Sequence, residues 1–183
     1  MHVVRVGRYA GILARQLGAQ EEWAETLEHA APLHDVGKIG IRDSILLKRG
    51  PLEPSEYEEM KEHCLIGTSI IRPASLRESC SRRGIEVPES PILKMACSIA
   101  ETHHERWDGN GYPDGIGETE IPLGSRLMLV ADTYEAMTSD RAYRKGLPHE
   151  VAIAELERCS GSQFDPECVK AFLAAHSEPP DLS

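Results

Sequence analysis

The stretch Ala30-Ala31-Pro32-Leu33-His34-Asp35-Val36-Gly37-Lys38 ends an apolar helical pattern with an adjacent imidazole and carboxylate. An ionised carboxylate that leaves water is costly unless it is paired, protonated or bound to a cation. We therefore interpret His34-Asp35 as the centre of a metal site. The remaining ligands must come from other segments of the chain, so this pair also predicts which helices meet.

Apolar residues recur at helical spacing on both sides of this stretch. The pattern predicts helices over residues 2–17, 23–34, 54–71, 91–103, 123–137 and 149–158, and a last helix from 165 onward. Pro32 lies inside the second of these, where a proline kinks or interrupts a helix. Gly37 and Gly40 should then break the chain into a loop. Because period-two alternation is nowhere long enough for a strand, we expect an all-α, single-domain bundle of about seven main helices.

Composition excludes several classes of protein. A net charge of −10 over 183 residues argues against a DNA-binding groove. No apolar run approaches the roughly 18 residues that a membrane span requires. Five cysteines without a CxxC pair, and no secretory leader, predict a reducing, cytoplasmic compartment. The helical pattern has already begun at Val3, so we expect residues 1–183 to be the C-terminal part of a longer chain. The stretch 74–90 is polar, which predicts a surface insertion.

Seven polar residues fall at predicted helix ends or on predicted buried faces: His2, His34, Asp35, His63, His103, His104 and Asp132. Mixed imidazole and carboxylate donors suit first-row divalent ions, and we expect Fe or Mn, with Co, Ni or Zn as alternatives. Seven ligands exceed the needs of one ion. We therefore expect two, with Asp35 as the bridging carboxylate. A single buried histidine is more often bonded to a carbonyl, but five histidines together with two aspartates favour a metal site.

Two adjacent metal ions would activate a shared water and clamp a phosphoryl oxygen, which predicts phosphoester hydrolysis. Asp35 and Lys38 are the catalytic candidates, because Lys38 should lie over the same site and stabilise charge on the phosphate. Arg141 and Arg144 can contact the phosphates from the opposite wall. We expect Glu105 to orient a histidine or to bond an arginine.

Several motifs together resemble an HD-GYP domain: His34-Asp35, His103-His104-Glu105, Gly111-Tyr112-Pro113 and Asp132-Thr133-Tyr134-Glu135-Ala136-Met137. The resemblance extends from His2 to about Lys145. It implies hydrolysis of the bacterial second messenger cyclic di-GMP to linear pGpG and on to GMP, by a metal-activated hydroxide. It also implies that the seven residues above bind metal. The substrate contacts that it implies are Lys38, Gly111, Tyr112, Pro113, Arg141 and Arg144.

The same resemblance bears on the number of metals and on partners. Some members carry a glutamate four residues before the position of His2 for a third metal, which this chain starts too late to contain, so we expect a dinuclear site. A receiver or sensory domain commonly precedes the domain in this family, and a homodimer is left open. Three alternatives stand: another cyclic dinucleotide as substrate, a nucleotide substrate as in the wider HD superfamily, and a non-catalytic signalling or interaction module.

Overall fold

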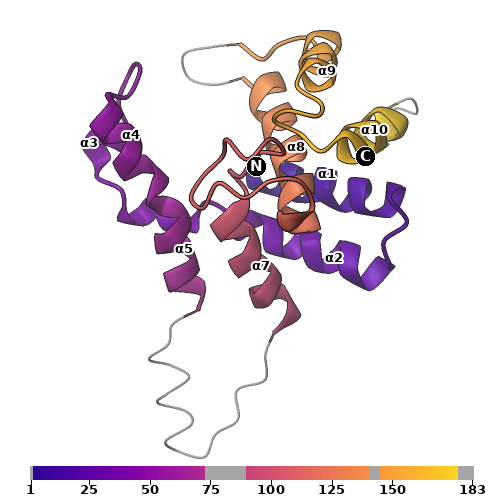
Figure 1. Cartoon of the computed structure of the whole chain (residues 1–183), viewed down its shortest axis with the longest axis horizontal. Helices are drawn as coiled ribbons and strands as arrows, with labels where there is room; N and C mark the ends of the chain where they lie inside the picture. The colour runs from indigo at the N-terminus through magenta and orange to yellow at the C-terminus, as the bar shows by residue number, and fades with distance from the viewer. Residues whose placement is uncertain (1, 73–89, 141–144, 177–183) are drawn as a thin grey trace, which may run out of the picture.

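Helix α1 (His2–Gln16) packs against α2 (Glu21–Ala30) and α8 (Leu123–Thr138) in the computed structural model, which describes residues 2–72, 90–140 and 145–176. Apolar residues at helical spacing give these helices continuous buried faces. The core they form is completed by α9 (His149–Arg158) and α10 (Pro166–His176), which cover the side of α8 in Figure 1. The rings of Tyr9, Tyr134 and Phe172 meet where α1, α8 and α10 converge.

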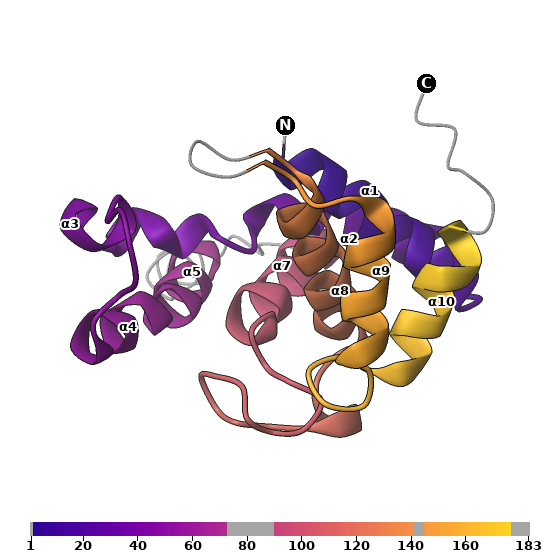
Figure 2. The ribbon, with the colours of Figure 1, turned by 90° about the horizontal axis from the view of Figure 1, so that it is seen from above.

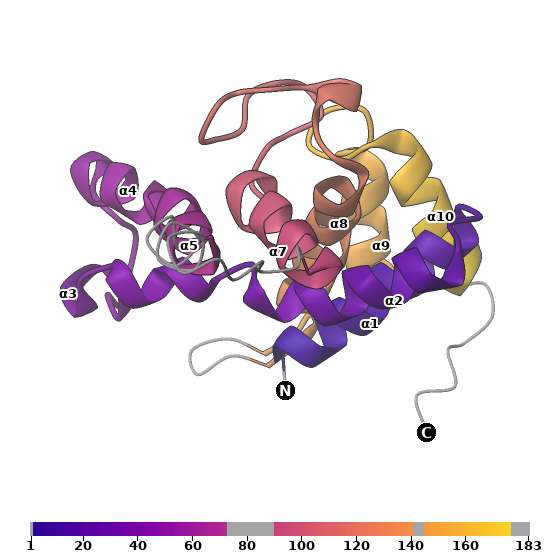
Figure 3. The ribbon, with the colours of Figure 1, turned by 90° about the horizontal axis from the view of Figure 1, so that it is seen from below.

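A second group of helices projects from this bundle. It consists of α3 (Asp43–Leu46), α4 (Pro54–Lys61) and α5 (His63–Ile71), and Figures 2 and 3 show it standing apart from α9 and α10. Helix α5 returns to the bundle by packing on α7 (Pro91–Thr102) and on the 3₁₀ helix η2 (Val36–Gly40). We call α3, α4 and α5 the arm.

Gly37 sets how closely the arm approaches the bundle. A Cβ atom at this position would lie 1.9 Å from the carbonyl oxygen of His63 and 2.4 Å from the amide nitrogen of Gly67. No side chain fits there, so the backbones of η2 and α5 are in direct contact. Gly37 therefore brings two ligand-bearing segments together. Gly37 and Gly40 lie within η2, so the prediction that they break the chain into a loop is wrong.

The all-α prediction is confirmed, with two differences in detail. Helix α2 ends at Ala30, and Pro32 lies in a short 3₁₀ helix, η1 (Ala31–Leu33), because proline has no amide hydrogen to continue an α-helix. The predicted helix over 54–71 is two helices, since the amide of Glu62 turns back to the carbonyl of Glu59. The described residues thus contain eight α-helices of eight residues or more, against about seven expected.

Two predictions lie outside the described residues. The first is the insertion over 74–90, of which only Ser90, the N-cap of α7, is described. The second is the pair of substrate contacts Arg141 and Arg144. Among the residues that are described, no helix has both the length and the apolar character to cross a membrane.

Candidate metal centre

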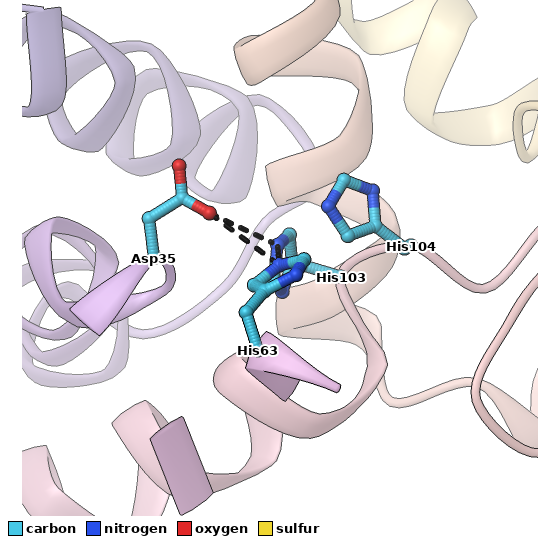
Figure 4. Close-up of side chains that lie close together, drawn as sticks. All are labelled: Asp35, His63, His103 and His104. Atoms are coloured by element: carbon cyan, nitrogen blue, oxygen red, sulfur yellow. Dashed lines mark hydrogen bonds and ion pairs between the residues drawn. The ribbon is translucent and has the colours of Figure 1, made fainter. Parts of the chain in front are cut away.

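Four of the expected ligands meet between the bundle and the arm. Asp35 lies between η1 and η2, His63 begins α5, and His103 and His104 follow the end of α7. One donor atom from each lies within 4.8 Å of the others. Figure 4 shows an Asp35 oxygen facing His63 and His103. We call Asp35, His63, His103 and His104 the first cluster.

Hydrogen bonds to backbone carbonyls fix which nitrogen of the buried histidines faces the site. Nδ1 of His34 lies 2.8 Å from the carbonyl of Ala31, and Nδ1 of His63 lies 2.7 Å from that of Met60. His103 repeats the arrangement, with Nδ1 2.9 Å from the carbonyl of Ile99. A carbonyl only accepts, so Nδ1 carries the proton in each neutral ring and Nε2 presents a lone pair.

Most of these lone pairs face other acceptors in the part of the chain that the structure describes, although the Cys64 thiol lies 3.7 Å from Nε2 of His63. Nε2 of His63 lies 3.5 Å from Nε2 of His103 and 3.5 Å from Oδ1 of Asp35. Among the described residues, Nε2 of His34 and Oδ1 of Asp35 are buried side-chain atoms that make no hydrogen bond. Buried acceptors that face one another are unfavourable unless a cation lies between them. The donors present therefore fit a divalent transition metal.

His2, His34 and Asp132 form a second cluster beside the first. Nε2 of His2 lies 3.3 Å from Oδ1 of Asp132, which projects from the middle of α8. Asp35 links the two clusters: its Oδ2 lies 3.3 Å from Nε2 of His34, while its Oδ1 faces His63 and His103. A carboxylate placed in this way can contribute one oxygen to each of two ions.

Electrostatics keep the first cluster ready to bind a cation. Burial lowers the pKa of His63 and His103, and burial together with the neighbouring His63 lowers the pKa of His104 to about 3. These rings are neutral at pH 7, as metal ligation requires. Burial raises the pKa of Asp35, but His34 and the ammonium of Lys38 outweigh it and hold this pKa well below its usual range.

The second cluster differs because its imidazoles face carboxylates. The Asp132 carboxylate raises the pKa of His2. Burial lowers the pKa of His34, but the Asp35 carboxylate outweighs it, and the pKa is raised. Burial likewise raises the pKa of Asp132, while His2 and His34 lower it below its usual value. A metal entering this cluster therefore competes with protons for His2 and His34 more than it does for the rings of the first cluster.

Lys38 lies at the edge of the site, as the sequence predicts. Its Nζ donates a 2.6 Å hydrogen bond to Oδ2 of Asp35, and more than a third of the side chain is exposed. It is therefore reachable from solvent while anchored next to the linking carboxylate.

The Gly111-Tyr112-Pro113 loop also reaches the first cluster. The Tyr112 ring stacks on His104 with centroids 4.7 Å apart, and its amide donates to the carbonyl of His104. A Cβ atom on Gly111 would lie 2.5 Å from the Cα atom of Glu105, so only glycine permits this approach. The peptide between Tyr112 and Pro113 is cis.

The expected role of Glu105 is wrong. Its Oε1 accepts the amide hydrogens of Asp114 and Gly115, at 2.7 and 3.1 Å, and its buried Oε2 makes no hydrogen bond with any described residue. The carboxylate is buried and holds the returning end of the Gly-Tyr-Pro loop. Glu105 was expected to act at the metal centre because it follows His103-His104 in the sequence, but its carboxylate faces the loop.

Two residues that support this site, Glu135 and Arg5, were not predicted from the sequence. Glu135 is buried on α8, one turn after Asp132, and its carboxylate contacts Nδ1 of His2 and the guanidinium of Arg5. It thus turns Nε2 of His2 towards Asp132, as a supporting carboxylate does for a metal-binding histidine. The three-residue spacing from Asp132 on one helix face was the available signal.

Comparison with known proteins gives one family for most of the described region. The HD domain model matches residues 2–168. A cyclic di-GMP phosphodiesterase of Thermotoga maritima is 44% identical over 99% of this chain and 45% of its own length. A 3'3'-cGAMP-specific phosphodiesterase 2 of Vibrio cholerae is 36% identical over 94% of this chain and 30% of its own. The chain thus spans less than half the length of either relative.

A solved structure has the same fold. It is a protein of Bdellovibrio bacteriovorus described as a HDG"Y"P protein, which aligns over 97% of this chain and 52% of its own with a TM-score of 0.67. At 18% sequence identity, the likeness is one of fold alone. It agrees with the helical architecture expected from the residue pattern.

Proposed function

Because this chain belongs to the HD domain family, we propose that it is a metal-dependent phosphodiesterase that hydrolyses cyclic di-GMP to linear pGpG. The observation that carries the proposal is Asp35, whose two oxygens face two separate clusters of imidazole and carboxylate donors. Two divalent ions, Fe or Mn first and Co, Ni or Zn otherwise, fit these donors. The first cluster would hold one ion and the second cluster the other. Asp35 would be a ligand of both ions.

Bound ions would supply Lewis acidity for the phosphoryl oxygens and lower the pKa of a water in their shell. The chain's own side chains orient the reactants. Lys38 offers a cation to the non-bridging phosphate oxygens, and its bond to Asp35 keeps the ammonium at the edge of the site. Glu135 and the carbonyls behind His34, His63 and His103 keep each Nε2 directed inward.

Gly111, Tyr112 and Pro113 are proposed to contact the substrate beside the first cluster, which the stacking of Tyr112 on His104 supports. Arg141 and Arg144 are proposed to bind phosphate oxygens and follow from the sequence alone. Cleavage of pGpG to GMP remains a proposal, as do a preceding receiver or sensory domain and a homodimer. None of these is required for the first hydrolytic step.

A second candidate substrate is 3'3'-cGAMP, because one relative at 36% identity is named as specific for it. The chemistry at the phosphate would be the same, and the difference would lie in the recognition of one base. A non-catalytic module is disfavoured because a binding scaffold has no use for seven metal donors, four of which are histidines oriented by supporting hydrogen bonds.

The direct test is metal content and turnover of protein purified without oxygen. We expect two metals per chain and hydrolysis of cyclic di-GMP by the Fe- or Mn-loaded protein. Asp35→Ala should lose metal and activity while circular dichroism shows the helices still formed, because Asp35 joins both clusters and is not part of the apolar core. Lys170→Ala on the far side of α10 is the control. Unchanged metal content in Asp35→Ala, or no hydrolysis by loaded wild-type protein, would contradict the proposal.

A further inference from the structure

An exposed aromatic ring stands next to the Gly-Tyr-Pro loop and takes no part in the metal centre. Tyr57, on α4 of the arm, is 47% exposed, although large aromatic side chains usually bury most of their surface. Its ring centroid lies 6.1 Å from that of Tyr112, at 79° between the planes. Tyr112 itself stacks on His104. The order from the first cluster outward is therefore His104, Tyr112, Tyr57.

A cation accompanies this ring. Nζ of Lys61, one turn later on α4, lies 5.5 Å from the centroid of Tyr57 and 5.9 Å from that of Tyr112. The ammonium also lies 2.7 Å from a carboxylate oxygen of Glu58, which is well exposed. An ammonium has three donors, so Lys61 keeps donors for a ligand while the two rings and Glu58 fix its position.

We propose that Tyr57 and Lys61 form a binding site for one purine base of the dinucleotide, and that Lys61 makes this site selective for guanine over adenine. The proposal rests on the proposed function, since it places a base beside a phosphodiester held at the metal centre. We call Tyr57 and Lys61 the α4 subsite.

Position and chemistry both support this assignment. A sugar separates each base of a cyclic dinucleotide from its phosphate. A base site must therefore lie about the width of one ring away from the phosphate site, and Tyr57 is separated from His104 by the ring of Tyr112. An exposed tyrosine face stacks on a base with a gain of about 1–3 kcal/mol. Stacking alone tolerates any base, so selectivity needs a directional group.

Lys61 can supply that direction. Guanine presents two adjacent acceptors, O6 and N7, whereas adenine presents N7 beside an amino donor. An ammonium group, which only donates, can bond both guanine acceptors but faces the adenine amino group unfavourably. The α4 subsite thus separates cyclic di-GMP from adenine-containing analogues through Lys61, and contributes affinity through Tyr57.

A structural role for the same contacts gives a different expectation. If Lys61 only tied α4 to the loop, its removal would weaken all substrates equally, including one without a base. Bis(4-nitrophenyl) phosphate is such a substrate for Lys61, because its nitrophenyl rings can stack on Tyr57 but do not present the adjacent O6 and N7 acceptors of guanine. Comparison of base-bearing and base-free substrates therefore distinguishes a recognition role from a structural one.

The experiment uses the metal-loaded full chain with Tyr57→Ala, Tyr57→Phe, Lys61→Met and the remote control Lys170→Met. We expect Tyr57→Ala to raise KM for cyclic di-GMP about tenfold or more, in line with the loss of one stacking contact. Tyr57→Phe keeps the ring and should stay within about twofold of wild type. Lys61→Met should lower the preference for cyclic di-GMP over cyclic di-AMP by about fivefold or more. Turnover of bis(4-nitrophenyl) phosphate by Lys61→Met should change by no more than about twofold, because this substrate lacks the guanine acceptors that Lys61 would bond.

Equal losses on all substrates, or an unchanged preference in Lys61→Met, would overturn the α4 subsite while leaving the phosphodiesterase in place. Absence of dinucleotide hydrolysis by wild-type protein would instead refute the proposed function. In that case calorimetric binding of linear pGpG and pApA to the same variants still decides the subsite. Tighter binding of pGpG that is lost in Tyr57→Ala supports it, and failure of wild-type protein to bind pGpG overturns it.

Discussion

Single hydrogen bonds behind the histidines determine what this centre can hold. In each of His34, His63 and His103, Nδ1 donates a hydrogen bond to the carbonyl three or four residues earlier in the chain, which is a local contact. The same bond aims Nε2 inward as an acceptor. Nδ1 of His2 instead contacts the carboxylate of Glu135, a residue of another helix. Glu135 should therefore matter to one cluster and not to the other.

Glu135→Gln tests this dependence. We expect it to weaken metal binding in the second cluster by about 10- to 100-fold, because the supporting carboxylate of His2 is removed. Metal content after dialysis against a weak chelator should fall from two per chain towards one. Glu157→Gln, at an exposed position of α9, is the matched control and should retain both metals. Equal loss from both clusters would show that Glu135 acts on the fold as a whole.

Glu105 should govern the Gly-Tyr-Pro loop. Glu105→Ala removes the acceptor of two amide hydrogens and should lower the free energy of unfolding by about 2 kcal/mol, since bonds to a charged acceptor are among the stronger ones. Trypsin should then cut after Arg106 faster than in wild-type protein. Glu105→Gln keeps an oxygen at this position and should restore most of the protection. Cleavage at the wild-type rate in Glu105→Ala would contradict a role in holding the loop.

At the scale of helices, the contact between η2 and α5 joins the arm to the metal centre. Asp35 precedes η2 and His63 begins α5, so the spacing of these two backbones sets the spacing of two ligands. The contact has no side chain between the backbones at Gly37. Packing of this kind has little capacity to absorb an added atom.

Gly37→Ala should consequently lower the free energy of unfolding by about 3 kcal/mol and reduce metal content, because the new methyl group must push His63 away from Asp35. Urea unfolding and elemental analysis measure the two effects. Gly124→Ala in α8 is the control: its Cβ meets the flexible end of Met95 at 3.0 Å, and alanine favours helix by about 1 kcal/mol. It should change stability by no more than about 1 kcal/mol. Similar losses in both variants would argue against a special contact at Gly37.

For the molecule as a whole, the bundle and the metal centre rest on different interactions. A buried ion pair between Arg126 of α8 and Asp165, at the start of α10, fastens the C-terminal helices to the core. Asp165 also accepts the amide hydrogen of Glu167. Neither residue belongs to either cluster, so the stability of the bundle and metal binding should separate experimentally.

Asp165→Ala tests that separation. It leaves the Arg126 guanidinium partly buried without its carboxylate and should cost about 3 kcal/mol or more in urea unfolding. At low temperature, where the protein stays folded, metal content should equal that of wild type. Glu155→Ala breaks an exposed pair with Arg158 and should leave the unfolding midpoint unchanged. Loss of metal in folded Asp165→Ala would show that the C-terminal helices support the site.

The sequence by itself determined the helical class and the borders of most helices, and it predicted the seven candidate donor residues. Periodicity and residue type are local properties, and the paired motifs at His34-Asp35 and His103-His104 name their chemistry directly. Pro32 likewise marked the end of α2, because the lack of an amide hydrogen acts at its own position.

Only the tertiary structure decided how the donors divide into two clusters and why Gly37 must lack a side chain. It alone also showed which groups Glu105 and Glu135 support, and that Tyr57 lies beside Tyr112. Each of these depends on the packing of segments that are distant in the chain. Burial then fixes which nitrogen of an imidazole is free and which carboxylate is shared, and no local pattern contains that information.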